Sequence, residues 1–176
     1  MNVHITSFHR TTFYVMDIYR TFTINKKLII MSYISSTYTS LYFHIVFSTK
    51  NRSRALSKEV IEHLKAYIIG YINNTGAKSI IINGIEDHIH LLFQVNNTHF
   101  NISEFVRELK KSTNKMLNQT FFNGKFAWQE GYFVGTISRW DTDKIKKYIQ
   151  HQEEHHKTMS FEEEWDAILN SIDNNK

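Results

Sequence analysis

Apolar residues occur along this chain of 176 residues either in short runs, which are typical of strands, or at helical spacing. The order of these two patterns predicts the elements of the fold. A run of aromatic and β-branched residues at 38–49 predicts a buried strand. Apolar residues then recur at helical spacing over 60–72, between Ser57 as an N-cap and the helix-ending sequence Asn73-Asn74-Thr75-Gly76. Apolar runs on either side of Asn83-Gly84 predict a strand pair that turns at those two residues, or one bent strand.

The same spacings continue in the second half of the sequence. They predict a helix over 102–117, a strand-like stretch over 126–138, a helix from about 143 to 156, and a last helix that begins at Ser160. The order strand, helix, strand, strand, helix, strand is that of a ferredoxin-like split βαβ sandwich. We therefore predict the α+β class, with an antiparallel sheet and an added C-terminal helix. Both main helices would cover one face of the sheet and leave the other face open for a ligand.

The regular spacing is lost at both ends of the chain. Residues 1–30 show no clear period, and we interpret them as an extension outside the fold, which would not be native if translation starts at Met31. An extra strand packed on the domain is the alternative. Residues 31–160 form the predicted domain, and residues 161–176 form an acidic C-terminal helix and tail.

Composition narrows the class of protein. The chain has no cysteine, which excludes disulfides and thiolate metal sites and fits a cytoplasmic protein. No apolar run reaches the roughly 18 residues of a membrane span, so we expect no membrane partner. The net charge is +4, with basic residues in excess over 38–152 and acidic residues in excess over 153–176. A basic body is compatible with a nucleic-acid partner and action at the nucleoid, and ordinary solvated charge is an equal alternative.

Two histidines form the clearest chemical motif. His88 and His90 lie in a predicted strand, where alternate side chains share one face, so they project from the same side roughly 7 Å apart at the backbone. Two imidazoles at this spacing can hold one metal ion, and the apolar residues 91–93 would support them rigidly. Two surface or hydrogen-bonded histidines without a metal are the alternative. In either case we expect both side chains at the sheet surface, where they contribute little to the core.

A tyrosine in the predicted helix 143–156 is the second candidate. Lys144 and Gln152 lie four residues before and after Tyr148 and would share its helix face. A phenol titrates at about 10, so a nucleophilic tyrosine needs a nearby cation, either a metal ion or Lys144. Gln152 offers a neutral oxygen that suits Mg²⁺ or Mn²⁺. A tyrosine that only packs in the core or in an interface is the alternative.

Three weaker patterns accompany these motifs. His151 and His155 match the H-x-x-E-H pattern of inverted zinc proteases, but few residues remain for a third ligand, and a solvated helix end is the simpler interpretation. Aromatic residues at 128–133 could stack on unpaired bases or pack in the core. Basic residues, which could contact phosphates or simply be solvated, occur at Arg52, Arg54, Arg107, Lys110, Lys111, Lys115 and Lys144.

Several of these motifs occur together in one known family. The chain resembles the single-tyrosine HUH transposases of single-stranded insertion sequences, the TnpA type, and their relatives associated with palindromic repeats. The likeness extends over about 38–161, and residues 1–30 have no counterpart in it. It rests on motifs in the right order and spacing: YFHIVFSTK at 42–50, DHIHLL at 87–92, LKKST at 109–113, WQEGYF at 128–133 and YIQHQEEHH at 148–156.

The resemblance implies a role for each candidate residue. His88 and His90 match the two metal-binding histidines, Tyr148 matches the nucleophile on the added helix, and Gln152 matches the third metal ligand. Members of the family act as homodimers, in which the tyrosine helix of one subunit can complete the metal site of the other. They cut and rejoin single-stranded DNA beside hairpins through a 5′-phosphotyrosine intermediate.

We therefore expect a metal-dependent DNA strand transferase that uses Mg²⁺ or Mn²⁺ and acts on single-stranded DNA with a hairpin. We expect a homodimer with composite active sites, formed at a sheet edge or at the first strand, which would otherwise expose its edge. The alternatives are a domesticated enzyme that nicks hairpin repeats and a non-catalytic nucleic-acid-binding module of the same fold.

Overall fold

The computed structural model describes residues 38–155, 163 and 166. The chain divides into two units, Met1–Tyr38 and Thr39–Lys176, and the elements below belong to the second. The interpretation of residues 1–30 as an extension lies outside the described residues. So does the predicted helix that begins at Ser160, apart from Glu163 and Asp166, which are both helical.

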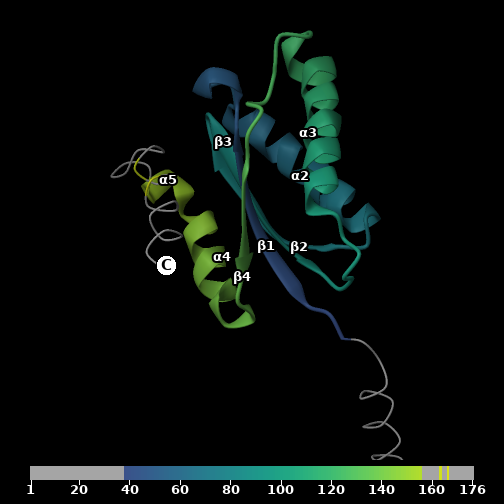
Figure 1. Ribbon diagram of the computed structural model, residues 1–176. Coiled ribbons are helices and arrows are strands. Elements are labelled where there is room, and N and C mark those ends of the chain that lie inside the picture. Colours follow the sequence, from purple (N-terminus) through teal and green to yellow (C-terminus); the bar gives the residue numbers. More distant parts are fainter. Residues whose placement is uncertain (1–37, 156–162, 164–165, 167–176) are drawn as a thin grey trace, which may run out of the picture. The chain divides into compact units, whose positions relative to one another are not determined.

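Four strands form one antiparallel sheet in the order β2-β3-β1-β4 (Figure 1). Their bounds are Leu41–Ser48 for β1, Lys78–Ile85 for β2, His88–Val95 for β3 and Phe133–Ile137 for β4. This is the strand order of a ferredoxin-like sandwich, so the predicted fold class is confirmed. The strand β1 is interior, paired with β3 and β4. The expectation that β1 exposes an edge for a dimer is therefore wrong, and the edges are β2 and β4.

Two long helices cover one face of the sheet, α2 at Lys58–Asn74 and α3 at Ile102–Leu117 (Figure 1). The backbone N–H of Val60 donates to Ser57 Oγ at 3.4 Å, which confirms Ser57 as the N-cap of α2. Asn101 caps α3 in the same way, through the N–H of Glu104. The apolar side chains of both helices meet those of the sheet in one core cluster, which includes Ile45, Leu64, Leu91, Phe93 and Leu109.

The other face of the sheet is covered as well, contrary to the expectation of an open face. The helix α4, Thr142–Gln150, lies against it, and the short helix α5, Gln152–His155, follows (Figure 1). The predicted single helix from 143 to 156 is thus two helices. None of the helices in the described part of the chain is long and apolar enough to span a membrane.

The turn between β2 and β3 lies at Glu86-Asp87, and Asn83-Gly84 are inside β2. The predicted strand pair is therefore confirmed, but its predicted turn is wrong. Gly84 is required for a different reason. A Cβ at this position would lie 2.5 Å from the backbone oxygen of His88 and 2.8 Å from Cγ2 of Ile89, so only glycine lets the strands approach this closely.

The segment between α3 and α4 differs most from its prediction. A π-helical turn at Asn118–Phe122 continues α3. The predicted strand over 126–138 is reduced to β4 and an isolated bridge between Thr49 and Trp128. The short 3-10 helices Lys50–Arg52 and Arg139–Asp141 follow β1 and β4 respectively. These short turns are set by tertiary contacts more than by local apolar spacing.

Candidate active site

The two histidines of β3 lie on the sheet face that α4 covers. His88 and His90 are both 0% exposed, and their ring centroids are 5.0 Å apart. Their shared face is as predicted, but the expectation of surface side chains is wrong because α4 excludes water from them. Burial of two imidazoles is costly unless each finds polar partners, so the contacts around them define the site.

The tyrosine and the glutamine approach these histidines from α4 and α5. The half-buried Tyr148 ring lies edge-on to His90, with ring centroids 5.9 Å apart. Gln152 is 0% exposed, and its Oε1 is 3.2 Å from Nε2 of His88. The structure therefore brings together four residues that the sequence places in two segments about 60 residues apart.

The route by which Gln152 reaches the site differs from the prediction. The backbone at His151, with φ −103° and ψ 25°, breaks the helix between α4 and α5. Gln152 therefore does not follow Tyr148 by one regular helical turn on a common face. His151 itself is exposed, and its Nδ1 is 2.8 Å from the carbonyl oxygen of Lys147. The break turns the glutamine amide toward β3 instead of continuing along the axis of α4.

An asparagine in β2 holds the end of α4 against the sheet. Asn83 Nδ2 donates to the carbonyl oxygens of Ile149 at 2.9 Å and Gln150 at 3.4 Å. These carbonyls belong to the last turn of α4, where the helix itself provides no donors. Ile149 is 0% exposed beneath the helix. Sequence reasoning missed this role of Asn83, whose signal was a polar residue inside an apolar run.

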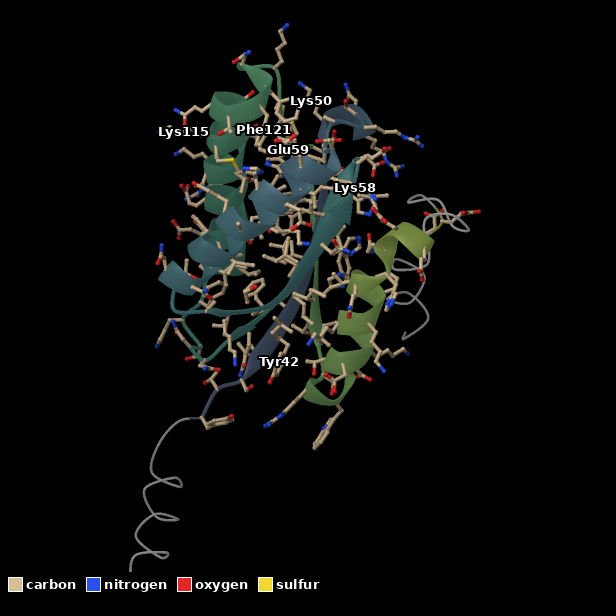
Figure 2. The ribbon with its side chains drawn as sticks, turned by 180° about the vertical axis from the view of Figure 1, so that it is seen from behind. Tyr42, Lys50, Lys58, Glu59, Lys115 and Phe121 are labelled. Carbon is tan, nitrogen blue, oxygen red and sulfur yellow. The ribbon has the colours of Figure 1, made fainter. Side chains whose placement is uncertain are left out.

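A charged contact supports the same arrangement from the first helix. Lys58 Nζ is 3.1 Å from Oε1 of Glu153, and so links the start of α2 to α5. Figure 2 shows Lys58 at the end of α2 that is nearest to α5. Both side chains are largely exposed. The pair therefore contributes little free energy, and the position of α5 depends mainly on the buried Gln152.

Each buried histidine has a different partner at its Nδ1 atom. His88 Nδ1 is 2.7 Å from Oδ1 of Asp87, whose other oxygen is 3.9 Å from Nε of Arg52. His90 Nδ1 is 3.0 Å from Nε2 of His44 in β1. Burial lowers the pKa of His44 to about 4, so this third imidazole is neutral at physiological pH. His44 was not among the predicted site residues, although its position in β1 puts it on the same face as His90.

The side chains present fit a metal ion only if the glutamine takes part. In the described part of the chain no three His, Cys, Asp or Glu side chains are grouped to hold one. Two ligand atoms about 2.1 Å from an octahedral ion stand about 3 Å apart, and His88 Nε2 and Gln152 Oε1 are separated by 3.2 Å. Nε2 of Gln152 is buried without a hydrogen-bond partner among the described residues. Two imidazoles and one amide oxygen thus fit a divalent ion that has further positions for DNA oxygens or water.

The predicted basic residues do not form one surface. Lys144 is exposed on α4, one turn before Tyr148. Arg52 and Arg54 lie near the acidic turn between β2 and β3, where Arg54 Nε is 3.7 Å from Glu86. The α3 residues lie elsewhere, and Figure 2 shows Lys115 on the opposite side of the molecule from α4.

The α3 lysines also differ from one another. The Lys110 ammonium donates to the backbone carbonyls of Gln129, Glu130 and Gly131, and it lies 5.7 Å from the centre of the Phe47 ring. Burial lowers the pKa of Lys110. Its neighbour Lys111 is exposed and 3.8 Å from Glu108. In this structure Lys110 therefore holds a loop in place, and any contact with DNA would have to replace these bonds.

A hollow lies beside α3. It has a volume of about 430 Å³, and its walls combine basic, amide and aromatic side chains: Arg107, Lys111, Asn114, Trp128 and Tyr132 among others. Trp128 is 8% exposed and donates from Nε1 to Thr113 Oγ1 at 3.0 Å, so it belongs mainly to the core. Tyr132 is half-buried. The aromatic stretch at 128–133 thus divides between core packing and the wall of this hollow.

Sequence and structure comparisons find transposases among the proteins similar to this chain. The chain is 27% identical over 119 residues to the ISDra2 transposase TnpA of Deinococcus radiodurans. The aligned region covers 64% of this chain and 84% of that protein. A crystal structure described as a transposase from the same organism superposes with a TM-score of 0.55 at 25% identity, covering 67% of this chain and 94% of the other.

A more distant likeness shows the fold alone. A REP-associated tyrosine transposase bound to a REP hairpin has a TM-score of 0.53 at 17% identity, over 69% of this chain and 72% of its own. The model of the family described as "Transposase IS200 like" matches residues 37–152, which include the histidine pair, the tyrosine and the glutamine. The chain therefore belongs to the IS200-like transposase family.

Proposed function

We propose that this protein cuts and rejoins single-stranded DNA through a covalent bond between DNA and Tyr148. One observation carries the proposal: Tyr148, the buried histidine pair and Gln152 come together between α4 and the sheet, from segments far apart in the sequence. Membership of a transposase family supports DNA strand transfer as the class of reaction.

The proposed first step is an exchange of one phosphodiester bond for another. Tyr148 Oη forms a bond to phosphorus, the bond from phosphorus to the 3′ oxygen breaks, and the leaving oxygen takes up a proton while the phenol loses one. The products are a 5′-phosphotyrosine and a free 3′-OH. Attack by the 3′-OH of another strand reverses the step, so the free energy of the bond is conserved and no nucleotide cofactor is needed.

His88, His90 and Gln152 would hold a divalent ion, Mg²⁺ or Mn²⁺. The ion, when bound, would polarise the scissile phosphate and compensate its growing negative charge. The residues of the chain supply its position. Asp87 and His44 fix the two imidazole rings, and Asn83 fixes the end of the tyrosine helix. A site held this rigidly keeps the nucleophile and the ligands in one geometry, which is the main requirement for in-line attack.

The substrate we propose is single-stranded DNA that carries a hairpin. The exposed Lys144 beside the tyrosine and the exposed cations Arg54, Arg107, Lys111 and Lys115 are candidate phosphate contacts. A homodimer remains part of the proposal. In the described chain, α4 already lies on its own sheet, so exchange of α4 between subunits would be a second arrangement of the same site.

The test is a trapped covalent adduct. A labelled hairpin oligonucleotide with single-stranded flanks, incubated with Mn²⁺ and the protein, is expected to give a protein–DNA adduct on a denaturing gel. Tyr148→Phe should abolish the adduct and retain DNA binding, because it removes only the phenolic oxygen. Tyr132→Phe is the matched control, since this half-buried tyrosine lies beside α3 and should leave the adduct unchanged.

The outcomes separate the alternatives. Adduct formation followed by joining to an added strand with a 3′-OH supports a transposase, and adduct without joining supports a nickase. Binding without any adduct would contradict catalysis and leave a nucleic-acid-binding module. Mass spectrometry that finds the DNA on a residue other than Tyr148 would contradict the assignment of the nucleophile.

A further inference from the structure

The two buried histidines differ in what holds their Nδ1 atoms. His88 faces a carboxylate, Asp87, which can only accept a hydrogen bond when ionised. His90 faces another imidazole, His44, at 3.0 Å. An imidazole nitrogen either donates or accepts, depending on which of the two ring nitrogens carries the proton. An ionised Asp87 therefore allows only one arrangement, with the proton of His88 on Nδ1. The position of the proton on His90 depends instead on which nitrogen of His44 is protonated.

We propose that His44 is a positioning residue that accepts a hydrogen bond at Nε2 from Nδ1–H of His90, and thereby keeps Nε2 of His90 deprotonated as a metal ligand. This inference rests on the proposed function, because it assigns the proton in the site that would hold the metal. It extends the site from β3 to the neighbouring strand β1, and it gives His44 no direct contact with DNA or metal.

The shared hydrogen bond allows two arrangements. In one, His44 Nε2 carries the proton and donates to Nδ1 of His90. A neutral His90 then carries its own proton on Nε2, where it blocks a metal. In the other, Nδ1 of His90 carries the proton and His44 Nε2 accepts it, so Nε2 of His90 offers a lone pair. Only the second arrangement is compatible with a metal, and it requires the neutral tautomer of His44 that is protonated at Nδ1.

The surroundings of His44 keep it in this contact. Its ring stacks on His90 with centroids 5.2 Å apart and an interplanar angle of 25°. The ring of Phe133 in β4 packs against it edge-on, with centroids 6.0 Å apart. His44 is 6% exposed and His90 is 0% exposed, so bulk water cannot replace the partner. A buried hydrogen bond of this kind is costly to lose, because the remaining donor stays unsatisfied.

Two variants separate the acceptor from the ring. His44→Phe keeps an aromatic ring in the stack and removes the acceptor. His44→Gln loses the ring and can place an amide oxygen close to the position of Nε2. We expect the affinity for Mn²⁺, measured by electron paramagnetic resonance on protein without DNA, to fall about 10–100-fold in His44→Phe. His44→Gln should retain most of the affinity of the unchanged protein. Equal Mn²⁺ affinity in His44→Phe and the unchanged protein would overturn the proposal.

A second measurement needs no variant. Nitrogen NMR of the histidine rings, with Zn²⁺ as a diamagnetic probe, reports which ring nitrogen carries the proton. The expected result for the metal-bound protein is protonation at Nδ1 in both His44 and His90. Protonation of His44 at Nε2 would overturn the proposal even if His44→Phe fails to fold.

The result can be separated from the test of the proposed function. If Tyr148 forms no adduct but His44→Phe still loses Mn²⁺ affinity, the positioning role stands and strand transfer fails. If the adduct forms and the NMR assigns the His44 proton to Nε2, strand transfer stands and the role of His44 fails. If the unchanged protein binds no Mn²⁺ at all, both the metal site and the role of His44 fail.

Discussion

The two faces of the sheet are made by the same strands but bury different kinds of groups. On the face under α2 and α3, residues such as Ile45, Leu91 and Phe93 pack in an apolar cluster. Three of the intervening positions of β1 and β3 carry histidines, His44, His88 and His90, and these lie on the face under α4 beside the apolar Val46 and Leu92. Both faces exclude water, but they differ in the polar groups they bury. The apolar face includes the bond from Trp128 to Thr113, whereas the α4 face must satisfy the histidines and Gln152 with specific partners.

This difference separates stability from chemistry. The apolar face depends on buried area and packing, which are non-directional and spread over many residues. The α4 face depends on a few directional contacts, from Asn83 to the end of α4, from Asp87 to His88 and from His44 to His90. A change on the apolar face should therefore lower stability with little effect on chemistry per folded molecule. A change on the α4 face should lower the rate of the chemistry per folded molecule, and it should also lower stability where it removes a buried side chain or a hydrogen bond.

The largest expected effect is on the α4 face. Replacing His88 and His90 together by Ala removes both proposed imidazole ligands, and we expect the rate of adduct formation to fall by at least about a thousandfold. The initial rate on a hairpin oligonucleotide with Mn²⁺ measures this, after circular dichroism has confirmed that the variant folds. Because both side chains are fully buried, some loss of stability is also expected. Undiminished cleavage by the double variant would contradict the metal site.

The opposite result is expected on the apolar face. Phe93 is 0% exposed, and its ring lies 4.9 Å from that of Phe105, between centroids. Phe93→Ala should lower the free energy of unfolding by about 3–5 kcal/mol, measured by denaturant titration. The rate of adduct formation per folded molecule should stay close to that of the unchanged protein. A variant that remains folded yet loses cleavage would show that the two faces are not independent.

A change in β2 tests how α4 is held. Asn83→Asp is nearly isosteric, but its carboxylate cannot donate to the carbonyls of Ile149 and Gln150. We expect a loss of about 1–3 kcal/mol in stability, because two hydrogen bonds are lost and each contributes about 0.5–1.5 kcal/mol. Hydrogen exchange of the α4 amides should become faster, while exchange in α3 should not change. Equal acceleration in both helices would mean that the substitution acts on the whole fold and not on the docking of α4.

The smallest expected effects come from two adjacent lysines. Lys110→Met removes an ammonium that donates to three loop carbonyls, and should lower the free energy of unfolding by about 1–3 kcal/mol. Lys111→Met removes an exposed ammonium and its ion pair with Glu108, and should leave stability within about 0.5 kcal/mol.

The salt dependence of DNA binding tests whether the second of these lysines, Lys111, contacts DNA. If Lys111 contacts a phosphate, its loss should reduce the slope of log affinity against log salt by about 0.7 for single-stranded DNA. Fluorescence anisotropy with a hairpin oligonucleotide at several salt concentrations measures the slope. An unchanged slope for Lys111→Met would leave this lysine as ordinary solvated charge.

Local sequence determined the order of the elements and most of their chemistry. The run of aromatic and β-branched residues at 38–49, the apolar runs around Asn83-Gly84 and the helical spacing of α2 and α3 predict a ferredoxin-like sandwich, because strand and helix periods depend on which face is buried. The shared face of His88 and His90 follows from the same period. The motifs of 87–92 and 148–156 indicated the family through resemblance, and the match over 37–152 confirms it.

Tertiary structure alone decided how these parts meet. Nothing local in the sequence shows that α4 covers the histidine face, that the helix breaks at His151, or which groups Asn83 and His44 contact. The sequence likewise gave no sign that the Lys110 ammonium is held by loop carbonyls. Each of these depends on groups that are distant in sequence, whereas spacing patterns report only whether a side chain is buried. The identity of the group that buries it, and the hydrogen bond it then requires, are set when the elements pack together.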